Sequence, residues 1–245
     1  LQLGAELYGD SSRAADLEVI ELMLSLLDAA GIDGDGLTVD LGHGGLFAPV
    51  LEASGLAPGA PQALALDAVQ RKSRPDLAAL LDGLPASPAG LLAELMDLHG
   101  GVDVLDRAAM LLADIPEAAA AVREVRLVAE GLQRRHPQLS LYIDLSELRG
   151  YRYHTGVVFA AYAQGLGEAL ARGGRYDNVG AVYGQARPAT GFATDLRLLA
   201  AQVETRKAPA EAIAAPDLED EALQARIREL RAAGETVIVS VGGNT

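Results

Sequence analysis

The stretch that decides the fold is residues 144–177, which read DLSELRGYRYHTGVVFAAYAQGLGEALARGGRYD. It contains two compact motifs, RGYRYHTG at 149–156 and GGRYD at 173–177. Arginine, tyrosine and histidine side chains of this kind bind carboxylates, amino groups and polar rings. The glycines let a ligand or a second backbone approach closely. The rest of the chain is therefore interpreted outward from this pair of motifs.

The segment between the motifs predicts a strand. Residues 153–161 are rich in valine, phenylalanine and tyrosine, which favour strands. We place Tyr153 and His154 inside this strand, where neighbouring residues face opposite sides of a sheet. We interpret 165–172 as strand-to-turn, so that the glycine pair Gly173–Gly174 forms a tight turn.

The remaining elements follow from periodicity and from turn residues. A run at 55–136 is dominated by alanine and leucine and is punctuated by prolines, which predicts a helical insertion between two halves of a sheet. The composition then changes after about residue 203. Outside these segments we expect strands at 1–8, 37–41 and 139–145, a helix ending at Gly31, a helix at 190–202, and a helix at 218–233 between two short strands.

This order of elements predicts an α+β fold with an antiparallel sheet flanked by helices. We expect a core at 1–203 that contains the helical insertion, and a small β-α-β unit at 204–245 whose completeness the sequence leaves open. The chain begins with Leu1 rather than methionine, so we expect it to be part of a longer protein.

The amino-acid composition restricts the classes of function and ligand that the chain can have. The net charge is −14 and the sequence pI is about 4.6, which disfavours binding to a phosphate backbone, so no nucleic acid partner is expected. The chain has no cysteine, and its four histidines lack local ligand spacing, so neither a metal site nor a cofactor is predicted. The cysteine count fits a reducing cytoplasm. No apolar run reaches the length needed to span a membrane.

Several polar residues are candidates for binding a small ligand. Arg149 offers a planar fork of donors that suits a carboxylate, although a surface ion pair is an equally simple role for it. Gln2 and Glu6 are four residues apart, so they share one face of a strand and suit a protonated ring or an ammonium group, or else form an ordinary exposed face. Tyr153 in the strand either binds polar groups of a ligand or packs in the core.

The motifs together resemble the histidyl-tRNA synthetase family. QLGAELYG at 2–9 resembles the end of its second class II motif, RGYRYHTGVVF resembles the family segment RGLDYYTGTVF, GGRYD is shared, and PATGFATDLRLL at 188–199 occupies the third motif. The resemblance covers residues 1–54 and 138–203 and implies a class II aminoacyl-tRNA synthetase-like sheet. It also implies a histidine-binding site with the candidates Gln2, Glu6, Arg149, Tyr153, His154 and Tyr176.

Departures from the family pattern change what the resemblance implies. Arg152 stands where family members carry aspartate, and His154 stands where they carry tyrosine. In the third motif Asp195 replaces a glycine, and Leu198 replaces the arginine that contacts ATP phosphates during adenylation. Replacing that arginine by leucine removes a charge-assisted contact to a polyanion, so aminoacylation is expected to be lost.

This combination resembles a second family, the regulatory subunits of ATP phosphoribosyltransferase. The resemblance implies a non-catalytic subunit in the first step of histidine biosynthesis, bound to a short catalytic subunit and dimerised within a hetero-octamer. It also implies that histidine is the small-molecule ligand and that tRNA is not a partner. Two alternatives stay open: a divergent histidyl-tRNA synthetase, and an amino-acid-binding or tRNA-modification paralogue.

Overall fold

The structure is a computed structural model in which the described residues form two compact units. The units are Leu1–Leu199 and Ala200–Thr245, and each is treated separately below. The described residues are 1–32, 36–82, 84, 86–148, 153–202 and 212–239. The candidate residue Arg149 and the family departure at Arg152 therefore lie outside the described residues.

The first unit is built on a seven-stranded sheet with the strand order β1-β7-β6-β5-β2-β4-β3. Neighbouring strands are antiparallel except for β2 and β4, which are parallel, so the sheet is mixed rather than purely antiparallel. The α+β class predicted from the sequence is confirmed. The strands are β1 Gln2–Tyr8, β2 Leu37–His43, β3 His99–Gly100, β4 Ser140–Asp144, β5 Val157–Ala163, β6 Ala171–Arg175 and β7 Ala189–Asp195.

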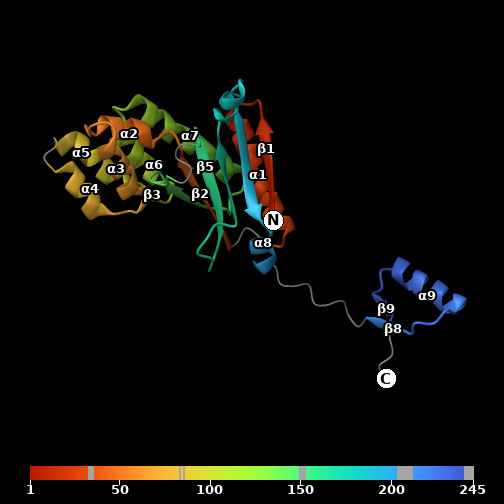
Figure 1. The fold of residues 1–245 in the computed structure, drawn as a ribbon. Helices are drawn as coiled ribbons and strands as arrows, with labels where there is room; N and C mark the ends of the chain where they lie inside the picture. Colours follow the sequence, from red (N-terminus) through yellow and green to blue (C-terminus); the bar gives the residue numbers. More distant parts are fainter. Residues whose placement is uncertain (33–35, 83, 85, 149–152, 203–211, 240–245) are drawn as a thin grey trace. The chain divides into compact units, whose positions relative to one another are not determined.

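Two long helices cover one face of this sheet, as Figure 1 shows. Helix α1 (Arg13–Ala29) packs against β6 and β7, and α7 (Pro116–Arg135) packs against α1, β2 and β5. Their apolar side chains, including Ile20, Met23 and Leu132, are fully buried in the main hydrophobic core. The opposite face of the sheet carries small and polar residues, and the candidate site lies there.

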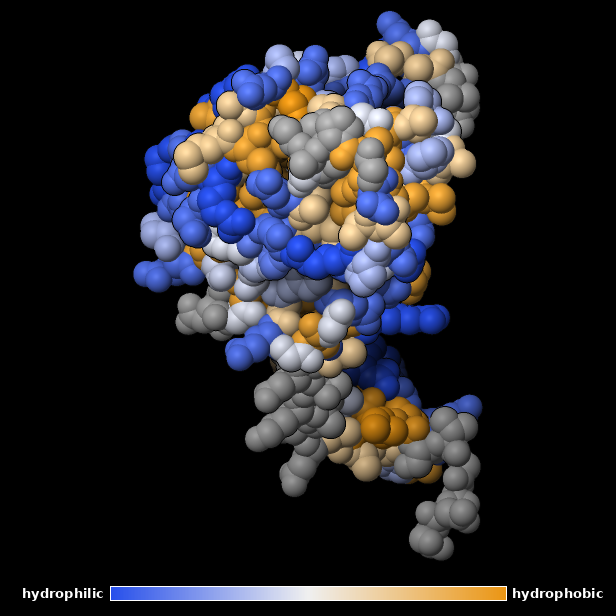
Figure 2. All heavy atoms as spheres, turned by 90° about the vertical axis from the view of Figure 1, so that its left-hand side faces the viewer, coloured by the Kyte–Doolittle hydropathy of each residue, from blue (hydrophilic) through white to orange (hydrophobic). Residues whose placement is uncertain are grey.

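Shorter helices gather beside the β3–β4 edge of the sheet (Figure 1). They are α2 Phe47–Ala53, α3 Ala60–Gln70, α4 Arg74–Leu81, α5 Ala86–Leu95 and α6 Val104–Leu111. Prolines stand in the first turn of α3, α4 and α7, where a missing N–H costs no helical hydrogen bond. Viewed from this side, hydrophilic side chains are spread between scattered hydrophobic ones (Figure 2). No helix in the described ranges has the length and apolar character needed to cross a lipid bilayer.

Three expectations about this region of the sheet are wrong. The strand expected from residue 153 begins at Val157, so Tyr153 and His154 precede β5 instead of alternating within it. The glycine pair expected in a turn lies inside β6. A Cβ on Gly173 would lie 2.3 Å from the carbonyl oxygen of Gly191 on the neighbouring strand, so glycine is needed there for close packing rather than for turning.

The third error concerns the segment expected to be a helix at 190–202. Its first part is strand β7, which pairs with β1 on one side and β6 on the other, and only Leu196–Gln202 is helical (α8). The region expected to be a helical insertion likewise contributes the two-residue strand β3 to the edge of the sheet. In β7, strand pairing overrides the helical preference of alanine.

The second unit is a β-α-β arrangement, as the sequence predicted. Strands β8 (Ile213–Ala215) and β9 (Val237–Val239) are parallel, and α9 (Glu221–Ala232) connects them. The Asp220 side chain accepts a hydrogen bond from the Leu223 backbone N–H at 2.9 Å and so caps the helix. A small core of Ala215, Ile227 and Val237 holds these elements together.

A hydrogen bond joins α7 to the end of β2. His43 is buried, its Nε2 lies 3.0 Å from a carboxylate oxygen of Glu124, and its Nδ1 accepts a hydrogen bond from the Gly45 backbone N–H at 3.1 Å. Because Nδ1 is an acceptor, Nε2 carries the hydrogen and donates it to Glu124. This contact lowers the pKa of Glu124, against the opposing effect of burial.

We expect the contribution of Glu124 to depend on pH. A carboxyl whose pKa is lowered in the fold stabilises it above the unfolded value of about 4.3, and this contribution disappears as pH falls through the folded pKa. Glu124→Gln should lower stability at pH 7 by roughly 1 kcal/mol or less, because the side chain is half exposed. Thermal unfolding at acidic and neutral pH should show that the difference in stability between Glu124→Gln and the parent protein disappears at low pH. The control Glu52→Gln removes an exposed carboxylate from α2 and should change stability little at neutral pH. A destabilisation by Glu124→Gln that persists in acid would contradict the prediction.

Candidate functional site

The floor of the candidate site is formed by two rows of residues that cross the open face of the sheet. Strand register places opposite residues of neighbouring strands on the same face. Most members of both rows are glycine or alanine, so the floor is low and a few long side chains stand above it. The first row is Glu6, Gly191, Gly174, Val158 and Gly42, and the second is Gly4, Ala193, Arg172, Ala160 and Asp40.

One end of the floor carries a group of residues that we call the tyrosine cluster: Glu6, Tyr8, Tyr153 and Tyr176. The Tyr8 hydroxyl donates a hydrogen bond to the Glu6 carboxylate. The rings of Tyr153 and Tyr176 are stacked, with centroids 4.8 Å apart and an interplanar angle of 29°. The ring of His154 meets Tyr153 edge-on at 5.1 Å. The cluster therefore combines one carboxylate with several aromatic faces.

The electrostatics of the cluster keep its tyrosines protonated. The hydrogen bond to Glu6 is the main cause that raises the pKa of Tyr8. Burial is the main cause that raises the pKa of Tyr153 and of Tyr176, and nearby Glu6 raises both further. Neutral hydroxyls can donate hydrogen bonds, while the carboxylate and the ring faces attract positive charge. This arrangement suits a protonated ring or another ligand that donates N–H groups.

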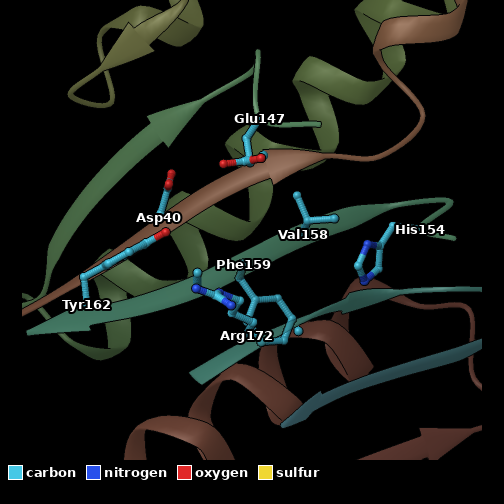
Figure 3. A pocket seen from close by; sticks show the side chains of 10 residues that line it. Asp40, Glu147, His154, Val158, Phe159, Tyr162 and Arg172 are labelled. Carbon is cyan, nitrogen blue, oxygen red and sulfur yellow. The ribbon is translucent and has the colours of Figure 1, made fainter. Parts of the chain in front are cut away.

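A cavity of about 190 Å³ lies beside the cluster, and His154 lines it. Figure 3 shows its polar side chains: Asp40 from β2, Glu147 from the segment after β4, Tyr162 from β5 and Arg172 from β6. An arginine and two carboxylates thus line the same open cavity.

The sequence candidates are only partly brought together. Glu6, Tyr153, His154 and Tyr176 lie at one end of the floor. Gln2 shares the face of Glu6, as predicted, but it is paired with Asp195, about 13 Å further along the strand. Arg149 is the candidate that lies outside the described residues.

Sequence reasoning missed several residues of the site. Tyr8 was detectable, because it lies two residues after Glu6 and therefore on the same strand face. Arg172 was hidden by the assignment of a turn, because it shares a strand face with Gly174 only if both lie in β6. Asp40 and Glu147 come from distant segments and have no local signal.

Arg175 of the GGRYD motif is structural rather than ligand-facing. Its buried guanidinium forms ion pairs with Asp16 at 2.9 Å and with Asp177, two residues further along the motif, at 3.2 Å. It also donates hydrogen bonds to the carbonyls of Asp10 and Ser12, both at 3.1 Å. Through these contacts Arg175 fixes the start of α1 against β6, beneath the tyrosine cluster.

The third motif is arranged around α8. Asp195 is exposed and accepts a hydrogen bond from the Arg197 backbone N–H at 2.7 Å, and this bond lowers the pKa of Asp195. Leu198 is partly buried and packs against the main hydrophobic core. Leu198, which the resemblance aligns with the phosphate-binding arginine of the synthetase motif, is therefore a side chain that packs against the core. Among the described residues, no group of three or more histidine and acidic side chains could hold a metal ion.

Comparison with protein families gives two matches. Residues 1–199 match the family model described as histidyl-tRNA synthetase. Residues 210–245 match the model described as the C-terminal domain of the ATP phosphoribosyltransferase subunit HisZ. The two matches fall on the two compact units.

Individual relatives agree with these matches. The ATP phosphoribosyltransferase regulatory subunit of Ectopseudomonas mendocina is 46% identical over 100% of this chain. That of Azotobacter vinelandii is 46% identical over 99% of it. The chain spans 62% and 61% of the length of these two relatives.

Solved structures show the same fold. An ATP phosphoribosyltransferase regulatory subunit/histidyl-tRNA synthetase from Bacillus halodurans is 27% identical, with a TM-score of 0.80 over 98% of this chain and 62% of its own. Histidyl-tRNA synthetase from a Nostoc species, at 20% identity and a TM-score of 0.75, covers 100% of this chain and 61% of its own and supports the fold alone. The chain belongs to the histidyl-tRNA synthetase family, and the relatives that it resembles over its full length are ATP phosphoribosyltransferase regulatory subunits.

Proposed function

We propose that this chain serves as a non-catalytic regulatory subunit of ATP phosphoribosyltransferase, in the first step of histidine biosynthesis. One observation carries the proposal: Leu198, which the resemblance aligns with the phosphate-binding arginine of the synthetase motif, is a partly buried side chain that packs against the core. A subunit of this kind retains recognition of an amino acid without the means to activate it.

The proposed ligand is histidine. Its imidazole would lie in the tyrosine cluster, with Glu6 opposite the ring nitrogens and Tyr153, Tyr176 and His154 around the ring. The raised pKa values of the two tyrosines support this placement, because neutral hydroxyls can donate to the ligand. Gln2 and Arg149 remain candidates on resemblance, the latter for the carboxylate.

The proposed partner is a short-form catalytic subunit in the cytoplasm, with this chain dimerised inside a hetero-octamer. A solved assembly from Thermotoga maritima, described as the HisG:HisZ complex of ATP phosphoribosyltransferase, makes such a partner reasonable for this branch. Histidine binding would then be coupled to catalysis by about 1–3 kcal/mol, and the coupling of binding affinities would be reciprocal.

The test is to mix the chain with a short-form catalytic subunit and to measure sedimentation and phosphoribosyltransferase activity in parallel. We expect a complex whose activity is inhibited by histidine more strongly than that of the catalytic subunit alone. The regulatory subunit of E. mendocina serves as the positive control for the assay. If the control assembles and this chain does not, or if histidine inhibition is unchanged, the proposal is wrong.

A divergent histidyl-tRNA synthetase is the second candidate, because the match to the synthetase model spans most of the chain. Histidine-dependent exchange between ATP and pyrophosphate separates the two. We expect no exchange above background, since lost phosphate contacts of this kind cost about 3–4 kcal/mol in the transition state. Clear exchange would favour the synthetase.

A further inference from the structure

Arg172 has only short side chains beside it on the open face of the sheet. It occupies the second row between Ala160 and Ala193, which are both too short to touch its guanidinium. Among the described residues it forms no hydrogen bond or ion pair, although the chain contains 34 acidic residues. An arginine presents a rigid fork of donors that suits a carboxylate, and here the fork is available to a ligand.

The cavity around Arg172 also contains negative charge. Asp40 and Glu147 line the same volume of about 190 Å³, together with Tyr162, and Figure 3 shows Arg172 on the opposite side of the cavity from Glu147. A group with one carboxylate and one ammonium can pair with Arg172 on one side of the cavity and with a carboxylate on the other.

The cavity lies next to the tyrosine cluster, because His154 lines the cavity and its ring also meets that of Tyr153 edge-on. Glu6 and Arg172 are separated by one row and two strands, or roughly 7 Å along the strands and 10 Å across them. Their two long side chains shorten that gap. The remaining space suits a free amino acid whose ring is at one end and whose head group is at the other.

We propose that the Arg172 cavity is the head-group subsite of the ligand: Arg172 binds the α-carboxylate, and Asp40 with Glu147 faces the α-ammonium. This inference rests on the proposed histidine site and adds to it a carboxylate partner other than Arg149. It makes Arg172 a specificity residue that separates the amino acid from amines and alcohols carrying the same ring.

The test is calorimetric binding of histidine, of histamine, which lacks the carboxylate, and of imidazole propionate, which lacks the ammonium. The unsubstituted chain should bind histidine most tightly. Arg172→Ala should weaken histidine by at least about tenfold and leave histamine unchanged, because only histidine presents a carboxylate to the lost guanidinium. Arg172→Lys should restore part of the difference, since it keeps the charge without the fork. Arg107→Ala, an exposed arginine on α6, is the matched control and should change neither ligand.

The outcomes are distinct. Equal weakening of histidine and histamine by Arg172→Ala would show that Arg172 only supports the fold of the site. An undiminished preference for histidine would place the carboxylate elsewhere, and either result overturns the subsite. Absence of histidine binding in the unsubstituted chain would reject the proposed function together with the subsite, whereas binding without a role for Arg172 would reject the subsite alone.

Discussion

Replacing Arg175 with alanine should lower the free energy of unfolding by about 3–5 kcal/mol, because the change leaves a buried carboxylate without its partner. Asp16 is 6% exposed and is held by Arg175 at 2.9 Å. The same substitution removes the hydrogen bonds to the carbonyls of Asp10 and Ser12, which tie the loop before α1 to β6. Urea denaturation followed by circular dichroism measures the loss.

The matched control is Arg71→Ala. Arg71 also pairs with two carboxylates, Asp67 at 2.6 Å and Asp76 at 3.0 Å, but all three side chains are about half exposed. Exposed pairs contribute about 0–1 kcal/mol, so this variant should stay close to the parent. If Arg175→Ala itself does not fold, the double variant Arg175→Met, Asp16→Leu should fold again, because it removes both buried charges. Equal, small effects of the two alanine variants would show that the buried network contributes little.

Replacing Glu6 with alanine should weaken histidine binding by at least about tenfold in calorimetry, since removing one partner of a buried charge pair costs about 2–5 kcal/mol. Glu6 is the carboxylate of the tyrosine cluster, and Tyr8 also loses its acceptor in this variant. Stability should hardly change, because Glu6 is exposed in the absence of ligand.

Glu18→Ala on α1 is the control for Glu6→Ala. It removes an equally exposed carboxylate from the outside of a helix, and it should leave histidine affinity unchanged. Glu6→Gln adds a finer test, because it keeps the shape and loses the charge; an affinity close to that of the alanine variant would assign the effect to charge. Unchanged affinity in both Glu6 variants would place the ring of the ligand away from the tyrosine cluster.

Local sequence patterns predicted the strands whose polar and apolar residues alternate. They failed for segments whose secondary structure is set by pairing with strands that are distant in the sequence. The strand of Gln2–Tyr8 and the β-α-β unit have strong local signals, and both were predicted. Strand β7 reads as helical because ATGFATD is followed by LRLL, yet its pairing with β1 and β6 makes it extended. The glycine pair in β6 was assigned to a turn, because the close approach of Gly191 cannot be seen in the sequence.

The candidate site likewise contains some residues with a local signal in the sequence and others that only the fold brings together. The tyrosine cluster combines residues from β1, the segment before β5 and the end of β6. Tyr176 was found through motif resemblance and Glu6 also through strand alternation, whereas Tyr8 was missed. The ion pair between Arg175 and Asp16 joins positions 159 residues apart, and no spacing rule connects them. The Arg172 cavity required both the register of β6 and the placement of Glu147, which only the three-dimensional structure provides.

The packing of Leu198 bears on how this fold could acquire the adenylation that the proposed function excludes. An arginine at this position would remove an apolar side chain that packs against the core, and a glycine in place of Asp195 would remove the oxygen that caps the start of α8. Each change alone would therefore weaken the helix before any contact with ATP phosphates formed. A gain of adenylation would then have to pass through less stable single variants.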